Sequence, residues 1–146
     1  MRTITIEYNG CKMTLRERLA RDVIDAPYLY DCIVSRLAER DNPTLDSSTR
    51  DGLKHNYYDG ITWSRVFHTC HMLLQVENVE GTLPEGIQLL GNTPTNQTIF
   101  AAYESVLNAP ADFALLWRNA ILTLEHPIPL ASPDVPSRKT KPSADG

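Results

Sequence analysis

The stretch RTITIEYNGCKMTL (residues 2–15) decides how the N-terminus folds, because the pair Asn9-Gly10 stands at its centre. Asn-Gly is a strong hairpin signal, since both central positions of a type I′ turn need a positive φ. On either side of this pair, apolar residues alternate with polar ones, namely Ile4, Ile6, Cys11, Met13 and Leu15. A two-stranded hairpin is only marginally stable alone in water. We therefore expect residues 1–15 to form a β-hairpin with one face packed on the rest of the chain.

Most of the remaining chain has apolar residues three or four positions apart, which is the spacing of helices. Asp25-Ala26-Pro27 interrupts the first such region, because proline suits only the first turn of a helix. Turn-rich residues 41–52 and the glycine- and proline-containing residues 80–95 interrupt the pattern again. The predicted helical segments are residues 16–24, 28–40, 59–79, 96–108 and 111–125. The short Asn108-Ala109-Pro110 link between the last two predicts a helical hairpin.

The composition changes sharply at His126. The twenty residues that follow hold five of the ten prolines and almost no large apolar side chains. Such a segment cannot bury enough surface to offset the entropy that is lost on ordering. We therefore predict one mainly α domain over residues 1–126, with four to five helices and a small N-terminal β-hairpin (1–15), followed by a disordered proline-rich tail over residues 127–146.

Length and charge exclude several classes of protein. The chain has 146 residues, which is enough for one domain with a substantial core. A formal net charge of −4 and a pI near 5.5 argue against a general nucleic-acid binder, because phosphate contacts require a basic surface.

No apolar run approaches the roughly 20 residues of a membrane-spanning helix. The N-terminus lacks the apolar segment of a signal peptide, and the three cysteines are too widely spaced to indicate a disulfide framework. We expect a cytoplasmic protein without membrane contact.

The sequence FHTCH (residues 67–71) is the densest group of potential metal ligands. His68 and His71 are three positions apart, so they would share one helix face, whereas Cys70 falls on the apolar stripe. A structural zinc needs four ligands, and no second pair of Cys or His residues is spaced to complete the set. The alternative is two histidines at the surface edge of an ordinary helix, beside a core cysteine. We favour that alternative and expect no bound metal.

Sequence motifs for catalysis are also missing. The chain contains no GxSxG, P-loop or GxGxxG sequence. The cysteines have the pattern of small core residues, and the acidic residues near helix ends are explained by capping and solubility. We therefore expect a protein without enzymatic activity or cofactor, which acts by binding.

Aromatic residues are the remaining candidates for a functional surface. The stretch NYYDGITW (residues 56–63) contains Tyr57, Tyr58 and Trp63, and tyrosine and tryptophan are favoured interface anchors. We predict that these three residues, with Phe113 and Trp117, line a groove that binds an apolar helical segment of a larger partner. The alternative for each of them is a place in the core.

The order of these features resembles a known family. The N-terminal hairpin leads into TLRERLARDVIDA (residues 14–26). Later, LPEGIQLLGNTPTNQTIFAAYESVLNAPADFALLWRNAILTLEHPI (residues 83–128) runs from a Leu-Pro-Glu loop into two short helices joined at Leu-Asn-Ala-Pro, and a proline-rich segment follows. This pattern is similar to that of the small tail assembly chaperones of long-tailed bacteriophages and prophages.

The resemblance implies a non-enzymatic assembly factor of the host cytoplasm. Such a protein would bind the tape measure protein, keep its apolar surface from aggregating and help to recruit tail tube subunits. Family members often have a longer form made by a ribosomal frameshift, and the tail (127–146) is compatible with one. The alternative is a small helical adaptor or regulatory protein of a phage or bacterium, which binds another protein or, as a less favoured case, DNA. The DNA-binding version requires a cluster of arginines on one face, drawn from Arg16, Arg18, Arg21, Arg36 and Arg40.

Overall fold

The structure is a computed structural model and describes residues 1–125, so the predicted tail (127–146) lies outside the described residues. In chain order the elements are β1 (Thr3–Tyr8), β2 (Cys11–Arg16), α1 (Ala20–Asp41), α2 (Ser47–Leu53), the 3₁₀ helix η1 (Lys54–Tyr57), α3 (Gly60–Leu74), β3 (Val76–Glu80), α4 (Asn96–Leu107) and α5 (Ala111–Glu125). The prediction of a mainly α fold with a small N-terminal hairpin is confirmed, and a third strand joins the hairpin.

The hairpin forms as the Asn9-Gly10 pair predicts. Asn9 and Gly10 have φ angles of 47° and 83°, so both central positions of the turn are in the left-handed region. β1 and β2 pair antiparallel, and Ile6 lies opposite Met13. Met13 and Leu15 are 0% exposed, which shows that one face of the hairpin is fully covered. The alternation of side chains across a strand therefore sets which residues enter the core.

The third strand corrects the predicted helix over residues 59–79. α3 ends at Leu74, and Val76–Glu80 pairs antiparallel with β2, with Val79 opposite Met13. Gln75 marks the change of direction: it is 0% exposed, and its Nε2 donates to the carbonyl oxygen of Arg16 at 2.9 Å. The sequence of this segment suits a helix or a strand, so the open edge of β2, which is distant in the sequence, decides its conformation.

The predicted break at Pro27 is also wrong. α1 is a single helix from Ala20 to Asp41 with Pro27 inside it. Proline has no N–H to donate to the carbonyl of Val23, and it is accommodated on an exposed side of the helix. Val23 and Ile24 have a helical spacing from Leu19 that suggests an apolar stripe, but they are 59% and 74% exposed. The buried residues in this part of the helix are Asp22, Ala26 and Leu29.

Replacing Pro27 with alanine should therefore stabilise the protein. The substitution restores a helical hydrogen bond at an exposed site, so we expect the free energy of unfolding to rise by about 1–3 kcal/mol. Chemical denaturation followed by circular dichroism measures this change. The same substitution would destabilise the protein if the chain broke at this position, because proline would then set the first turn of a second helix.

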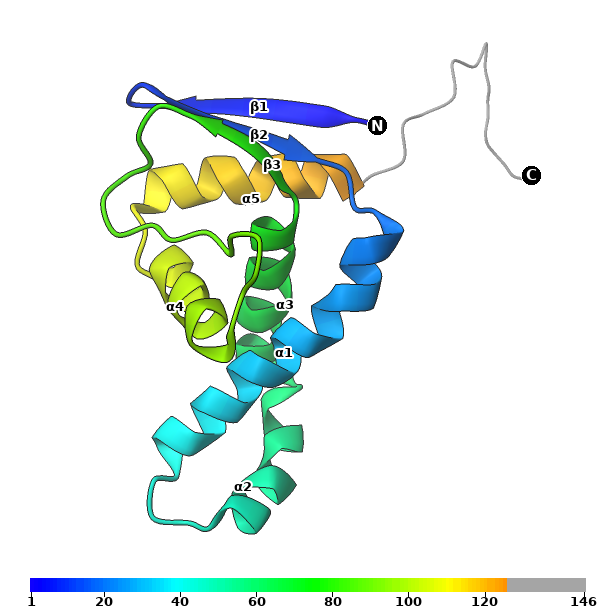
Figure 1. The fold of residues 1–146 in the computed structure, drawn as a ribbon, viewed down its shortest axis with the longest axis vertical. Helices are drawn as coiled ribbons and strands as arrows, with labels where there is room; N and C mark the ends of the chain where they lie inside the picture. The colour runs from blue at the N-terminus through cyan, green and yellow to red at the C-terminus, as the bar shows by residue number, and fades with distance from the viewer. Residues whose placement is uncertain (126–146) are drawn as a thin grey trace, which may run out of the picture.

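The helices are arranged in two layers beneath the sheet (Figure 1). α5 packs against β1 and β2 and shields the inner face of the sheet, while α1, α3 and α4 pack on one another. The predicted helical hairpin is wrong in this respect, because α4 packs on α1 and α3 whereas α5 packs on the sheet and α3. One core cluster joins the sheet to α3, α4 and α5, and a second lies among α1, α3 and α4.

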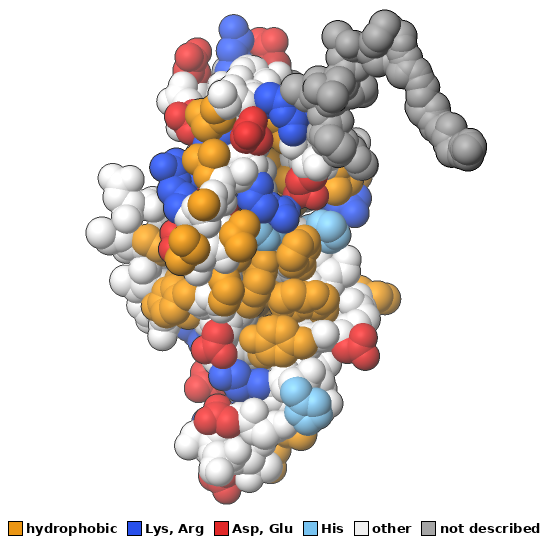
Figure 2. Space-filling view, turned by 90° about the vertical axis from the view of Figure 1, so that its right-hand side faces the viewer, with side chains coloured by type: hydrophobic (Ala, Val, Ile, Leu, Met, Phe, Trp, Pro, Cys, Tyr) orange, Lys and Arg blue, Asp and Glu red, His pale blue; other side chains and the backbone are white. Residues whose placement is uncertain are grey.

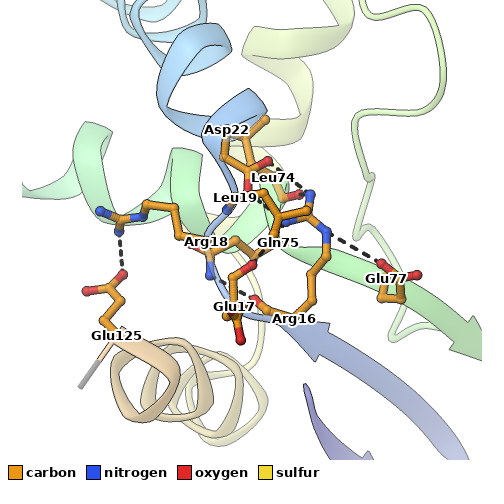
Figure 3. A network of polar contacts seen from close by, with 9 residues as sticks. All are labelled: Arg16, Glu17, Arg18, Leu19, Asp22, Leu74, Gln75, Glu77 and Glu125. Carbon is orange, nitrogen blue, oxygen red and sulfur yellow. Dashed lines mark hydrogen bonds and ion pairs between the residues drawn. The ribbon is translucent and has the colours of Figure 1, made fainter. Parts of the chain in front are cut away.

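A buried ion pair fixes the start of α1 to the sheet (Figure 3). Arg16, the last residue of β2, donates from Nη1 and Nη2 to the two carboxylate oxygens of Asp22 at 2.6 and 2.9 Å. Its Nη2 also donates to the carbonyl oxygen of Leu74 at 2.8 Å, and its Nε lies 3.5 Å from Glu77 Oε1. Asp22 accepts from the N–H of Leu19 as well, which caps the helix. The contacts hold together the end of β2, the start of α1 and the junction of α3 with β3.

Candidate partner-binding surface

Two of the five predicted groove residues lie in the core. Phe113 and Trp117 are 1% and 0% exposed, and their rings are 5.8 Å apart between the sheet and α3. Trp117 Nε1 donates to the carbonyl oxygen of Met72 at 3.1 Å, so its polar group is paired inside the protein. Phe113 and Trp117 are therefore core residues, which was the alternative to a place in the groove.

Of the other three residues, Tyr58 and Trp63 belong to an aromatic cluster on one side of the molecule. Tyr57 lies outside it and donates from its hydroxyl to Asp41. Trp63 contacts Tyr30 of α1 and Tyr58, with ring centroids 4.9 and 5.1 Å apart, and Phe67 completes the cluster. Figure 2 shows a band of hydrophobic side chains across this side. Trp63 and Tyr57 pack against the core among α1, α3 and α4, whereas Tyr58 is 41% exposed. Within the cluster, Trp63 and Tyr30 therefore close the helical core.

The FHTCH segment is an ordinary part of α3, although one of its histidines is buried. Cys70 is 0% exposed, as expected of a core cysteine, and burial raises the pKa of its thiol. His71, expected at the surface edge, is only 3% exposed, because Tyr30 and Phe67 cover it. Burial and, secondarily, the charge of Arg18 lower the pKa of His71 to about 4, so the ring is neutral at pH 7. Its Nε2 lies 2.6 Å from the hydroxyl of Tyr30.

The described part of the chain shows no group of three or more His, Cys, Asp or Glu residues that could hold a metal ion. Among residues 1–125 no helix is long and apolar enough to cross a membrane. Cys11, Cys32 and Cys70 are all free and buried. The absence of metal and of catalysis stays a prediction.

A groove of about 680 Å³ lies between the first half of α1, the strand β3 and residues 89–94; we call it the α1–β3 groove. Leu29 and Leu73, which are 3% and 4% exposed, line its deeper part. Ile24 and Tyr28 line it from α1 and are 74% and 56% exposed. They are four residues apart, so both project from the same side of the helix. Large apolar side chains thus flank a depression whose floor is apolar, whose lining also includes Arg21, Asp25 and Glu77, and which no described segment fills.

The walls of this groove are held in place by polar contacts. The buried Arg16–Asp22 pair joins the start of α1 to the sheet, and both residues line the groove. At the other side, the hydroxyl of Tyr28 donates to Asn96 Oδ1 at 2.9 Å, which ties α1 to the first residue of α4. A groove with fixed walls can accept a partner without a large ordering cost.

None of the five sequence-predicted site residues lines the α1–β3 groove. Most of its lining comes instead from α1, β3 and residues 89–94, with Leu73 and Leu74 of α3 and Arg16 of β2. The sequence prediction divided α1 at Pro27 and assigned β3 to a helix. One signal was present. α1 carries apolar residues on more than one side, with Val23 and Ile24 adjacent and Tyr28 one turn later, and a helix with a single buried stripe does not need them.

No family model, no curated protein and no solved structure matches this chain.

Proposed function

We propose that this protein is a non-enzymatic tail assembly chaperone of the cytoplasm that binds an apolar helical segment of the tape measure protein in the α1–β3 groove. The observation that carries the proposal is the groove itself, with deep leucines and the exposed Ile24 and Tyr28 beside them. Apolar helices bind in such grooves through side chains spaced three or four residues apart. The tape measure protein is proposed as the partner because the sequence resembles tail assembly chaperones. The groove is a surface that suits an apolar helical segment of that partner.

The distribution of arginines supports a protein partner over DNA. Four of the five arginines that could form a basic face are in ion pairs: Arg16 with Asp22, Arg18 with Glu125, Arg36 with Glu39, and Arg40 with Asp41 and Glu104. A carboxylate beside each guanidinium weakens the positive field that phosphate contacts need. The field of the described helices therefore does not favour a nucleic acid.

Co-expression with the tape measure protein tests the proposal. We expect the partner to stay soluble and to co-purify with this chain, and Ile24→Asp to weaken the complex at least about tenfold, because a charge would enter the apolar contact. Val23→Asp is the matched control: Val23 is adjacent and 59% exposed, but it does not line the groove. Since burial drives binding, the affinity should change little between low and high salt.

Two results would count against this function. If the tape measure protein stays insoluble and nothing co-purifies, the chaperone proposal fails. If Ile24→Asp and Val23→Asp weaken the complex equally, the α1–β3 groove is not the binding surface. Binding of an unrelated protein in the same groove would favour the adaptor alternative.

A further inference from the structure

A second groove, of about 350 Å³, lies between α3 and α5 on a different part of the surface; we call it the α3–α5 groove. Met72 and Val106 line it and are only 4% and 5% exposed. Three large aliphatic side chains around it are exposed: Ile61 is 73% exposed, Leu107 44% and Leu115 54%. These residues form an apolar depression with apolar edges.

The side of α3 that lines this groove is not the side that carries the aromatic cluster. Ile61, Arg65, His68 and Met72 recur every three or four residues, so they form one stripe along the helix. The aromatic residues of α3 occupy another stripe, and the α1–β3 groove shares no lining residue with the α3–α5 groove. The two grooves can therefore be occupied independently.

The charges along the α3–α5 groove have one sign. Arg65 and Arg118 line it, together with His68, and no aspartate or glutamate does. Within residues 1–125 neither arginine is in an ion pair, whereas Arg2, Arg36 and Arg40 on other exposed surfaces are. The net charge of the chain is −4, yet both charged side chains that line this groove are arginines, and no carboxylate in the lining neutralises them. They suit carboxylates supplied by a partner.

We propose that the α3–α5 groove docks an amphipathic helix of a second partner, whose aliphatic side chains enter the groove and whose flanking aspartates or glutamates pair with Arg65 and Arg118. This inference goes beyond the proposed function, because it concerns a separate surface and a second partner with acidic flanking residues. A helix suits the site, since the exposed aliphatic residues come from α3, the end of α4 and α5, and side chains at helical spacing can contact all three. A protein with both grooves occupied would hold two helical partners at once.

A pair of designed peptides tests the charge preference with the full-length protein. Both peptides have about 20 residues, long enough to form a helix, with leucines three and four positions apart. One carries glutamates beside the leucines and the other carries lysines at the same positions. Titration by fluorescence anisotropy should show that the glutamate peptide binds at least about tenfold more tightly. The double variant Arg65→Glu/Arg118→Glu should reverse this preference.

A substitution on α5 tests the location. Leu115→Asp should remove binding of the glutamate peptide, whereas Leu116→Asp should not, because Leu116 is also exposed but does not line the groove. Circular dichroism confirms that both variants are folded. Equal binding of the two peptides, no binding of the glutamate peptide, or equal effects of the two α5 substitutions would overturn the proposal. So would a dimer of this chain that Leu115→Asp dissociates, because the occupant would then be a second copy.

Discussion

Replacing Asp22 with alanine is expected to lower the free energy of unfolding by about 3–5 kcal/mol, because the buried guanidinium of Arg16 loses its two short hydrogen bonds to a carboxylate and keeps only the longer contact with the half-exposed Glu77. The two side chains are only 5% and 2% exposed, so the guanidinium is poorly hydrated once its partner is removed. Asp22 also accepts from the N–H of Leu19 at the start of α1, and that cap would be lost. Chemical denaturation at pH 7, followed by circular dichroism, measures the loss.

A control and a rescue separate the ion pair from a general effect on the helix. Asp25→Ala changes an exposed carboxylate of the same helix, and we expect less than about 0.5 kcal/mol. The double variant Arg16→Met/Asp22→Leu should recover much of the lost stability, since apolar residues can replace a buried ion pair without leaving a charge unpaired. A loss below about 1 kcal/mol for Asp22→Ala would contradict the buried network.

The same carboxylate should make the protein less stable in acid. Burial by itself would raise the pKa of Asp22, but hydrogen bonds from Arg16 and Leu19 and the nearby positive charges outweigh burial and lower it. A carboxyl group with a lowered pKa stabilises the fold fully above its unfolded-state pKa of about 3.9. That contribution disappears as the pH falls through the folded-state pKa. The difference in unfolding free energy between wild type and Asp22→Ala should therefore be smaller in acid than at pH 7.

Replacing Trp117 with alanine should also cost about 3–5 kcal/mol of stability. The indole is 0% exposed in the core between the sheet and α3, so alanine would leave a large cavity. The carbonyl of Met72 would lose the hydrogen bond from Nε1 as well. Denaturation followed by circular dichroism is suitable, because the substitution removes one of the two tryptophans and changes the fluorescence signal.

Two further variants show whether the effect comes from core volume. Trp117→Phe keeps part of the ring and should lose less stability than Trp117→Ala, while Leu116→Ala at an exposed neighbour should change it by less than about 0.5 kcal/mol. Similar stabilities for Trp117→Ala and Leu116→Ala would place Trp117 at the surface and restore it as a groove residue.

The sequence by itself determined the elements that depend on local interactions. Asn9-Gly10 sets a turn whose two positive φ angles few other pairs adopt, and the alternation of Met13 and Leu15 selects the buried face. The apolar spacing predicted helices over residues 96–108 and 111–125, close to α4 and α5, because the period of an amphipathic helix is visible in its own sequence. The burial of Cys70 followed from its place on the apolar stripe of α3.

Only the tertiary structure decided the features that require residues far apart in the sequence. Val76–Glu80 becomes a strand because β2 has an open edge beside it, and α1 continues through Pro27 as one helix that packs on α3 and α4. Phe113 and Trp117 are in the core because α5 lies under the sheet, while Ile24 and Tyr28 are exposed because β3 and the loop leave a groove beside them. Periodicity identifies an apolar face, but the elements that pack against that face determine whether its residues are buried or available to a partner.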